Sequence, residues 1–119
     1  MAKIVNLKSI EDKRGTLVIA QDEIPFSIAR VFFIYGTSEM RGGHRHIRNR
    51  MGLIAQQGSV EVFCQNSTTE SLHTLSNPSQ CLLVDPEDWH TMKFSKNAVL
   101  LVLSSEKYDE EDYITDRYR

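Results

Sequence analysis

Short apolar runs separated by turn residues make up most of this sequence. Residues 59–64 alternate polar and apolar side chains, as a half-buried strand does. Residues 28–35 are rich in β-branched and aromatic side chains, which favour strands. Residues 81–84 and 98–103 are apolar throughout and have strand length. The pattern therefore predicts a chain built mainly of short strands.

Turn chemistry divides the strand-like runs at regular intervals. The separators include Gly15, Gly36, Gly42-Gly43, Gln57-Gly58, Asn77-Pro78 and Asp85-Pro86. About eight short strands with this spacing favour a sandwich or barrel. We expect an all-β cupin or jelly roll, a double-stranded β-helix whose two sheets enclose a cavity. Residues 106–118 could also hold a short C-terminal helix, with Ser104 or Ser105 as its N-cap.

Size and charge narrow the class of protein. A length of 119 residues predicts one domain spanning residues 1–119. The 14 basic and 16 acidic residues give a net charge of −2. The sequence therefore has no excess of basic residues that would predict binding to nucleic acid or to an anionic membrane. No apolar run has the length of a membrane span, and the first residues do not resemble a signal peptide. The default expectation is a cytoplasmic protein, in which Cys64 and Cys81 are buried free thiols; a disulfide between them is the alternative.

The tripeptide His44-Arg45-His46 is the most informative candidate for chemistry, because it holds two of the four histidines. Side chains two residues apart on a strand point to the same face, so the two imidazoles are expected to lie together. Arg45 is then expected to point to the opposite face. Imidazole titrates near neutral pH and can transfer protons or bind a metal.

The spacing after this tripeptide follows a metal-binding cupin pattern with one ligand replaced. Met51 stands where that pattern has a glutamate, six residues separate it from Gly58, and a later block supplies His90. Three imidazoles suffice for zinc, whereas iron and manganese sites usually include a carboxylate. We therefore prefer His44 and His46 as proton-transfer groups, with no metal and no cofactor. A metal-dependent cupin is the less favoured alternative.

Other residues near these motifs are candidates for binding. Arg41 carries a planar guanidinium suited to a phosphate or carboxylate. Trp89 could stack on a sugar or base, or plug the end of the sandwich. His90 is expected to face the pocket.

The order of several motifs resembles the sugar 3,4-ketoisomerases of the WxcM-like cupin family. The resemblance runs through Arg14-Gly15, Ile24-Pro25-Phe26, residues 30–35, residues 41–46, residues 86–90, residues 101–105 and Tyr108-Asp109-Glu110-Glu111-Asp112-Tyr113-Ile114. It covers nearly the whole chain, and the ordered set is more specific than any one piece.

This resemblance implies a metal-free jelly-roll homodimer with an N-terminal strand exchanged between subunits. Such enzymes move the keto group of dTDP-4-keto-6-deoxyglucose from C4 to C3, for sugars of bacterial surface polysaccharides and some antibiotics. The acid and base roles carry over onto His44 and His46. Tyr35 or Arg41 is expected to polarise the oxygen on which negative charge develops. Binding of the dTDP-linked sugar is assigned to Arg41 and Arg14, together with Trp89 and His90.

Four positions depart from the family pattern, and one of them is Arg45, which stands between the histidines where a small residue such as alanine is common. Met51 replaces a common glutamine, and Phe32 and Phe33 stand where tyrosines are frequent. Methionine offers no hydrogen bond to fix a histidine tautomer. A non-catalytic module that binds a dTDP-sugar is therefore the alternative to the isomerase.

Overall fold

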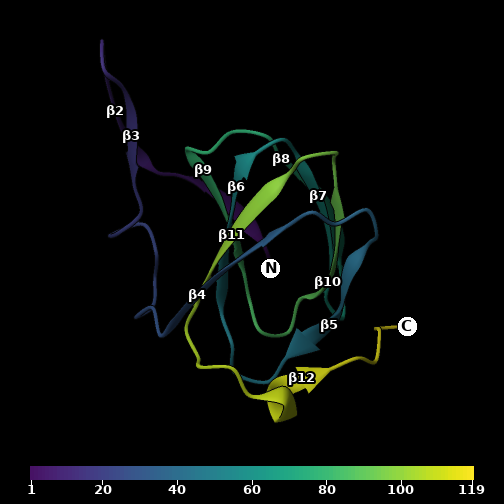
Figure 1. Cartoon of the computed structure of the whole chain (residues 1–119). Helices are drawn as coiled ribbons and strands as arrows, with labels where there is room; N and C mark the ends of the chain where they lie inside the picture. Colours follow the sequence, from purple (N-terminus) through teal and green to yellow (C-terminus); the bar gives the residue numbers. More distant parts are fainter.

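Antiparallel strand pairing organises the chain (Figure 1). The computed structural model describes residues 1–119. The elements are β1 (Lys3–Asn6), β2 (Lys8–Asp12), β3 (Gly15–Ile19), β4 (Arg30–Tyr35), β5 (Arg41–His46), β6 (Met51–Gln57), β7 (Val60–Gln65), β8 (Glu70–Leu75), β9 (Gln80–Val84), β10 (Trp89–Phe94), β11 (Val99–Ser104), the 3₁₀ turn η1 (Glu110–Asp112) and β12 (Tyr113–Ile114). The predicted all-β class is confirmed. No helix is long and apolar enough to cross a membrane.

Two five-stranded sheets form the body of the molecule. The first sheet has the order β1-β9-β6-β11-β4, the second has the order β12-β5-β10-β7-β8, and β2 and β3 form a separate hairpin. From β4 to β7, and again from β8 to β12, each successive strand lies in the other sheet. The chain therefore closes around a shared interior, as the predicted double-stranded β-helix requires.

The first sheet is buried on both faces, and this explains its apolar runs. Leu53 and Leu100 belong to the inner core, where they join Val62 of the second sheet. Their neighbours along the strands belong to a second cluster on the outer face, made of Leu7, Ile24, Ile54, Cys81, Leu83 and Leu103. A strand covered on both sides needs no polar alternation. Residues 7–26, which precede β4, supply much of the outer cover.

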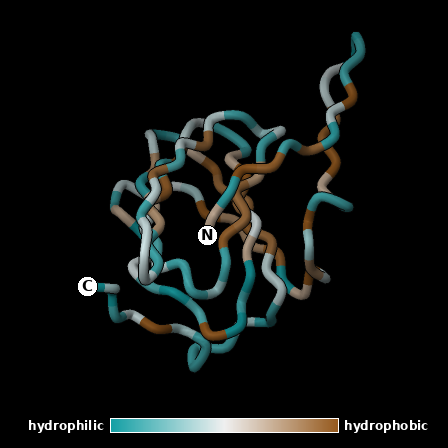
Figure 2. The backbone as a smooth tube through the Cα atoms, turned by 180° about the vertical axis from the view of Figure 1, so that it is seen from behind, coloured by the Kyte–Doolittle hydropathy of each residue, from teal (hydrophilic) through white to brown (hydrophobic).

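The β2–β3 hairpin stands away from the body, as Figures 1 and 2 both show. It lengthens the molecule to 50 Å along one axis, against 31 and 25 Å along the others. Ile10 and Leu17 on this hairpin are 47% and 56% exposed. The hairpin therefore carries apolar side chains that this chain alone leaves uncovered.

The expected C-terminal helix is wrong in extent and in its cap. Only the three residues of η1 are helical, and the side chain of Asp109 caps them by accepting from the backbone N–H of Glu111. Ser104 ends β11, and the hydroxyl of Ser105 accepts from the backbone N–H of Arg50 at 2.8 Å. The segment after β11 binds β5 and the loop that follows it, so its polar groups are used in tertiary contacts instead of helical ones.

A bulge at Gly42 adjusts the pairing of β5 with β10. His90 lies opposite His44, and the register then shifts so that Thr91 lies opposite Gly42. Gly42 has a φ of 88°, and a Cβ there would lie 2.8 Å from the carbonyl oxygen of His90. Glycine is required here by both backbone conformation and close approach.

We predict that Gly42→Ala destabilises the fold more than Gly36→Ala. Both positions have positive φ, but a Cβ at Gly36 meets nothing within 4 Å. The control should therefore lose only the conformational term, about 1 kcal/mol, whereas Gly42→Ala also forces β5 away from β10. Urea unfolding followed by tryptophan fluorescence measures both losses. Equal losses would show that the β5–β10 contact can relax around a methyl group.

Candidate active site

Three histidines meet between the two sheets. His44 and His46 lie on the same face of β5, with ring centroids 5.0 Å apart, as strand alternation predicts. His90 enters from β10, with its ring centroid 4.9 Å from that of His44 and 6.1 Å from that of His46. The pairing of β5 with β10 therefore adds a third imidazole to the pair.

The rings line a cavity of about 180 Å³. Its lining consists of Phe32, Ile34, Arg41, Gly42, His44, His46, Met51, Leu53, His90, Met92, Val102 and Tyr113. Apart from the histidines, Arg41 and Tyr113, the side chains of this lining are apolar. A small apolar chamber with a few convergent polar groups is typical of a ligand site.

Burial keeps the imidazoles neutral. It is the largest of the causes that lower the pKa of His46 to about 3, and the neighbouring His44 and His90 contribute to the same shift because a second positive charge would be repelled. Burial likewise lowers the pKa of His90 to about 4, and it lowers the pKa of His44. All three rings therefore have a free nitrogen lone pair at neutral pH.

Two ring nitrogens are open to a ligand. Nδ1 of His90 lies 3.0 Å from the carbonyl oxygen of Asp88. A carbonyl only accepts, so Nδ1 carries the proton and Nε2 is the basic nitrogen. The Nε2 atoms of His90 and His46 are buried and have no partner in the protein. Buried polar atoms are usually satisfied, so the site is suited to a bound hydroxyl group, which can donate to the basic Nε2 of His90.

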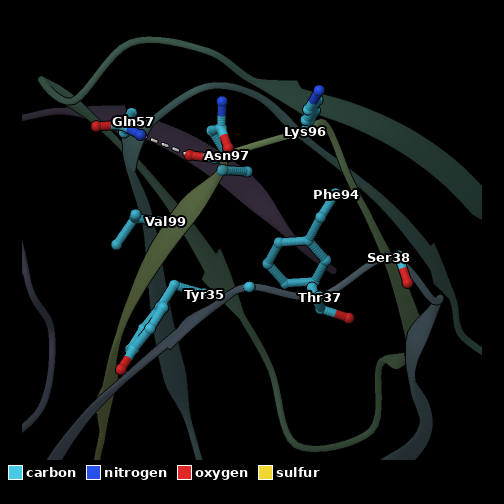
Figure 3. Close-up of a pocket in the computed structure, with 10 residues that line it drawn as sticks. Tyr35, Thr37, Ser38, Gln57, Phe94, Lys96, Asn97 and Val99 are labelled. Atoms are coloured by element: carbon cyan, nitrogen blue, oxygen red, sulfur yellow. Dashed lines mark hydrogen bonds between the residues drawn. The ribbon is translucent and has the colours of Figure 1, made fainter.

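Tyr35 does not join this site, which corrects its predicted catalytic placement. On β4, Phe32 and Ile34 face the cavity, and Tyr35 therefore points to the outside, where it is 68% exposed. Its ring stacks on Phe33. It lines a different groove of about 640 Å³ at the turn that follows β4, together with Thr37, Lys96 and Asn97 among others (Figure 3).

Trp89 and Arg14 also lie outside the cavity. Trp89 precedes His90 on β10 and so faces the other way; its indole Nε1 donates to the carbonyl oxygen of Thr115 at 3.1 Å. Trp89 therefore lies under the C-terminal segment and is not among the residues that line the cavity. Arg14 lies at the hairpin turn, where its guanidinium pairs with Asp12 at 2.6 Å. Of the predicted binding residues, the structure brings Arg41 and His90 to the histidine pair.

Met51, which stands where metal-binding cupins have a glutamate ligand, is part of the apolar wall of the cavity. Met51 is 5% exposed and lines the cavity. The structure contains no group of three or more His, Cys, Asp and Glu side chains arranged to hold a metal ion. Cys64 and Cys81 are free and buried, and burial raises the pKa of both thiols to about 12.

Tyr113 is the site residue that sequence reasoning missed. Its ring centroid lies 4.7 Å from that of His44 and 4.7 Å from that of His46. It follows η1 on the short strand β12, which pairs with β5. The available signal was the Tyr-Asp-Glu-x-Asp-Tyr-Ile motif, which contributed to the resemblance but received no role.

The comparison with known proteins agrees over the whole chain. The family described as "FdtA: WxcM-like, C-terminal" matches residues 1–119. The chain belongs to this family. It is 41% identical over 117 residues to TDP-4-oxo-6-deoxy-alpha-D-glucose-3,4-oxoisomerase from Aneurinibacillus thermoaerophilus, a match that covers 94% of this chain and 84% of that protein. The predicted relationship is confirmed.

Solved structures of this kind share the fold. QdtA, a sugar 3,4-ketoisomerase from Thermoanaerobacterium thermosaccharolyticum solved with TDP, is 37% identical with a TM-score of 0.92, over 97% of this chain and 88% of that one. WlaRB, a TDP-quinovose 3,4-ketoisomerase from Campylobacter jejuni, is 36% identical with a TM-score of 0.93, over 97% and 92%. A QdtA variant with one histidine changed to asparagine was solved with TDP-4-keto-6-deoxyglucose. The cupin-like fold is confirmed.

Burial of neutral histidine predicts a stability that falls in acid. His90 has a pKa of about 4 when folded, below its ordinary 6.5, so the unfolded chain binds the extra proton below about pH 6.5. The lowered pKa of His90 therefore has no effect on the free energy of unfolding above that pH, and it reduces this free energy as the pH decreases toward 4. We expect His90→Asn to reduce the loss of unfolding free energy between pH 7 and pH 5 by on the order of 1–2 kcal/mol.

Urea unfolding at several pH values measures this difference. His73→Asn, on β8 outside the cavity, is the matched control for the loss of one histidine. An unchanged slope for His90→Asn would contradict the assignment of a buried neutral imidazole.

Proposed function

We propose that this protein is a sugar-nucleotide 3,4-ketoisomerase with a single cupin domain over residues 1–119. It moves the keto group of a dTDP-4-keto-6-deoxyhexose from C4 to C3 by metal-free acid/base catalysis. The observation that carries the proposal is the pair of neutral imidazoles, His44 and His46, side by side in a small cavity with His90. The family and its named ketoisomerase members support it.

The first half of the reaction removes a proton from C3. One neutral imidazole takes that proton, and the electron pair of the C3–H bond forms the C3=C4 double bond. The C4 carbonyl oxygen becomes a hydroxyl by accepting a proton, which gives an enediol. A histidine with a lowered pKa is in the required basic form at neutral pH.

The second half restores a ketone at C3. The hydroxyl on C3 loses its proton, C3=O forms, and the electron pair of the double bond takes a proton at C4. An imidazolium in this chamber is a strong acid, because burial and the neighbouring imidazoles disfavour its charge. It therefore returns a proton to the sugar readily. No oxidant or reductant is consumed, since one hydrogen leaves each of C3 and O3 and one joins each of C4 and O4.

Arg41 is suited to the anionic part of the substrate. It lies at the start of β5, it lines the cavity, and it is exposed to solvent. Its planar guanidinium can bind two oxygens of a diphosphate at once. In this arrangement the sugar enters between the sheets while the nucleotide remains at the opening. A substrate of this class, together with the two free cysteines, supports a cytoplasmic location.

Deuterium exchange tests the reaction. The protein is incubated in D₂O with dTDP-4-keto-6-deoxyglucose, and NMR follows exchange at C3 and appearance of the 3-keto sugar. We expect His44→Asn and His46→Asn each to lower turnover by roughly 10²–10⁴-fold, because general acid and base groups contribute about this much. His73→Asn, outside the cavity, should turn over at the wild-type rate.

Two other outcomes identify the alternatives. Tight binding of the dTDP-sugar by calorimetry, with no exchange in the wild type, would make the chain a binding module. Loss of activity in chelator, restored by a transition metal measured in the protein, would establish a metal-dependent cupin.

We further propose that two copies form a homodimer. Val31, Phe33 and Tyr35 on the outer face of β4 are 56%, 63% and 68% exposed, and β4 is an edge strand. Ile10 and Leu17 on the projecting hairpin are also uncovered. Exposed apolar patches of this kind favour association. The strand exchange implied by the family resemblance would bring the hairpin, and Arg14 with it, to the other copy and not to its own cavity.

Light scattering after size-exclusion chromatography tests the dimer. We expect about twice the 13.7 kDa mass of one chain, and a shift toward the monomer in Phe33→Asp and Leu17→Asp. Leu72→Asp is the control, because Leu72 is 65% exposed on β8 of the second sheet. A wild-type monomer at micromolar concentration would refute the dimer.

A further inference from the structure

One buried carboxylate holds the backbone immediately after the histidine pair. Three consecutive amides follow His46, and all three donate to Asp112: Ile47 to its carbonyl oxygen at 3.0 Å, Arg48 to Oδ1 at 2.8 Å, and Asn49 to Oδ2 at 3.1 Å. Asp112 is 2% exposed. Both oxygens of its carboxylate therefore hold the backbone that directly follows β5.

The residue after this carboxylate contacts the histidines directly. Tyr113 pairs with His46 in the β12–β5 ladder. Its ring meets the ring of His46 edge-on and that of His44 at an angle of 53°, each at 4.7 Å between centroids. One short segment thus holds the backbone of β5 and packs against both functional side chains.

The rest of the C-terminal segment is tied to the same end of the sandwich (Figure 1). The indole of Trp89 donates to the carbonyl oxygen of Thr115, and the hydroxyl of Tyr118 donates to the carbonyl oxygen of Glu87 at 2.7 Å. Arg45, which points away from the histidines as predicted, places its guanidinium 4.7 Å from the centre of the Tyr118 ring. These contacts hold Tyr113 in place from both sides.

We propose that Asp112 and Tyr113 are positioning residues for the two imidazoles, the first by fixing the backbone of β5 and the second by bracing both rings. The inference rests on the proposed function for its meaning in catalysis, but its structural content is independent. An imidazole that must reach adjacent carbons of a sugar cannot rotate freely, because small misplacements cost large factors in rate. No hydrogen bond from the protein holds the buried Nε2 of His46, so packing must hold its ring.

The same contact excludes water from His46. The charged and titratable groups that act on its pKa are His44 on β5, His90 on β10, Asp112 at the end of η1 and Arg30 on β4. Burial is the largest of these influences, and Tyr113 supplies part of that burial. Removing the Tyr113 ring should therefore raise the pKa of His46 toward its ordinary 6.5.

Tyr113→Leu and the conservative Tyr113→Phe form a matched pair. We expect Tyr113→Leu to lower kcat by about 10-fold or more with little change in KM, because it loosens the rings. NMR titration of the histidine ring signals should show a raised pKa for His46 in this variant. Tyr113→Phe keeps the aromatic brace and should retain both the rate and the titration of the wild type.

Asp112→Asn tests the backbone contact. The amide keeps one accepting oxygen and loses the other, so we expect a several-fold lower kcat and faster hydrogen exchange at the amides of residues 47–49. Asp109→Asn is the control, because Asp109 caps η1 at the exposed surface without touching these amides. If Asp112→Asn does not fold, the Tyr113 pair decides the proposal alone.

The outcomes separate this proposal from the proposed function. A wild type with no exchange activity, but with the expected titration shift in Tyr113→Leu, would refute the isomerase and support the bracing contact. Wild-type rate and titration in Tyr113→Leu would refute the bracing contact. Equal loss of rate in Tyr113→Phe and Tyr113→Leu would also overturn it, because the hydroxyl and not the ring would then be required.

Discussion

The antiparallel contact between β5 and β10 is the constraint on which the site depends. It places His90 opposite His44, and strand alternation places His46 beside them. The contact requires Gly42, since a side chain there would meet the backbone of β10. Three imidazoles are thus gathered from two strands that lie far apart in the sequence. The cavity then follows, because the side chains with which the facing sheet lines it are apolar.

Burying polar rings in an apolar cavity costs free energy, so other contacts in the fold must offset that cost. Two buried ring nitrogens, Nε2 of His46 and Nε2 of His90, are left without partners in the protein, and an unsatisfied buried polar group costs about 1–3 kcal/mol. The two-sided burial of the first sheet provides the opposing stability, since its inner and outer faces each hold an apolar cluster. On the other side, Asp112 binds three consecutive amides and closes the end of β5. The free-energy cost of the site is therefore offset by contacts in elements that take no part in the chemistry.

Local rules predicted much of this arrangement from the sequence. Period-two alternation placed His44 and His46 on one face and Arg45 on the other, and continuous apolar runs marked strands that are covered on both sides. The same alternation, applied along residues 32–35, separates Tyr35 from Phe32, and along β10 it separates Trp89 from His90. Strand alternation alone would therefore have placed Tyr35 and Trp89 outside the cavity.

Long-range contacts account for what the sequence could not predict. The acidic stretch around Asp112 looks like a solvated or helical tail, because its partners are backbone amides more than 60 residues away and every amino acid but proline carries such a group. Tyr113 was not predicted as a site residue because its contacts with His44 and His46 are also long-range. The exposed apolar side chains of the hairpin and of β4 depend on a surface outside this chain, so no pattern within it shows what covers them.

Met51 replaces the glutamate ligand of metal-binding cupins, and this replacement also affects the proposed proton transfer. A glutamate at this position would place a negative charge beside the histidines, stabilise their protonated forms and raise their pKa values. The thioether instead extends the apolar wall formed with Leu53, Met92 and Val102. Burial then dominates, and the rings are neutral bases whose protonated forms are strong acids. The replacement that removes a carboxylate ligand from the metal pattern is therefore also the one that keeps the imidazoles neutral, so that a protonated ring readily returns its proton to the sugar in the proposed reaction.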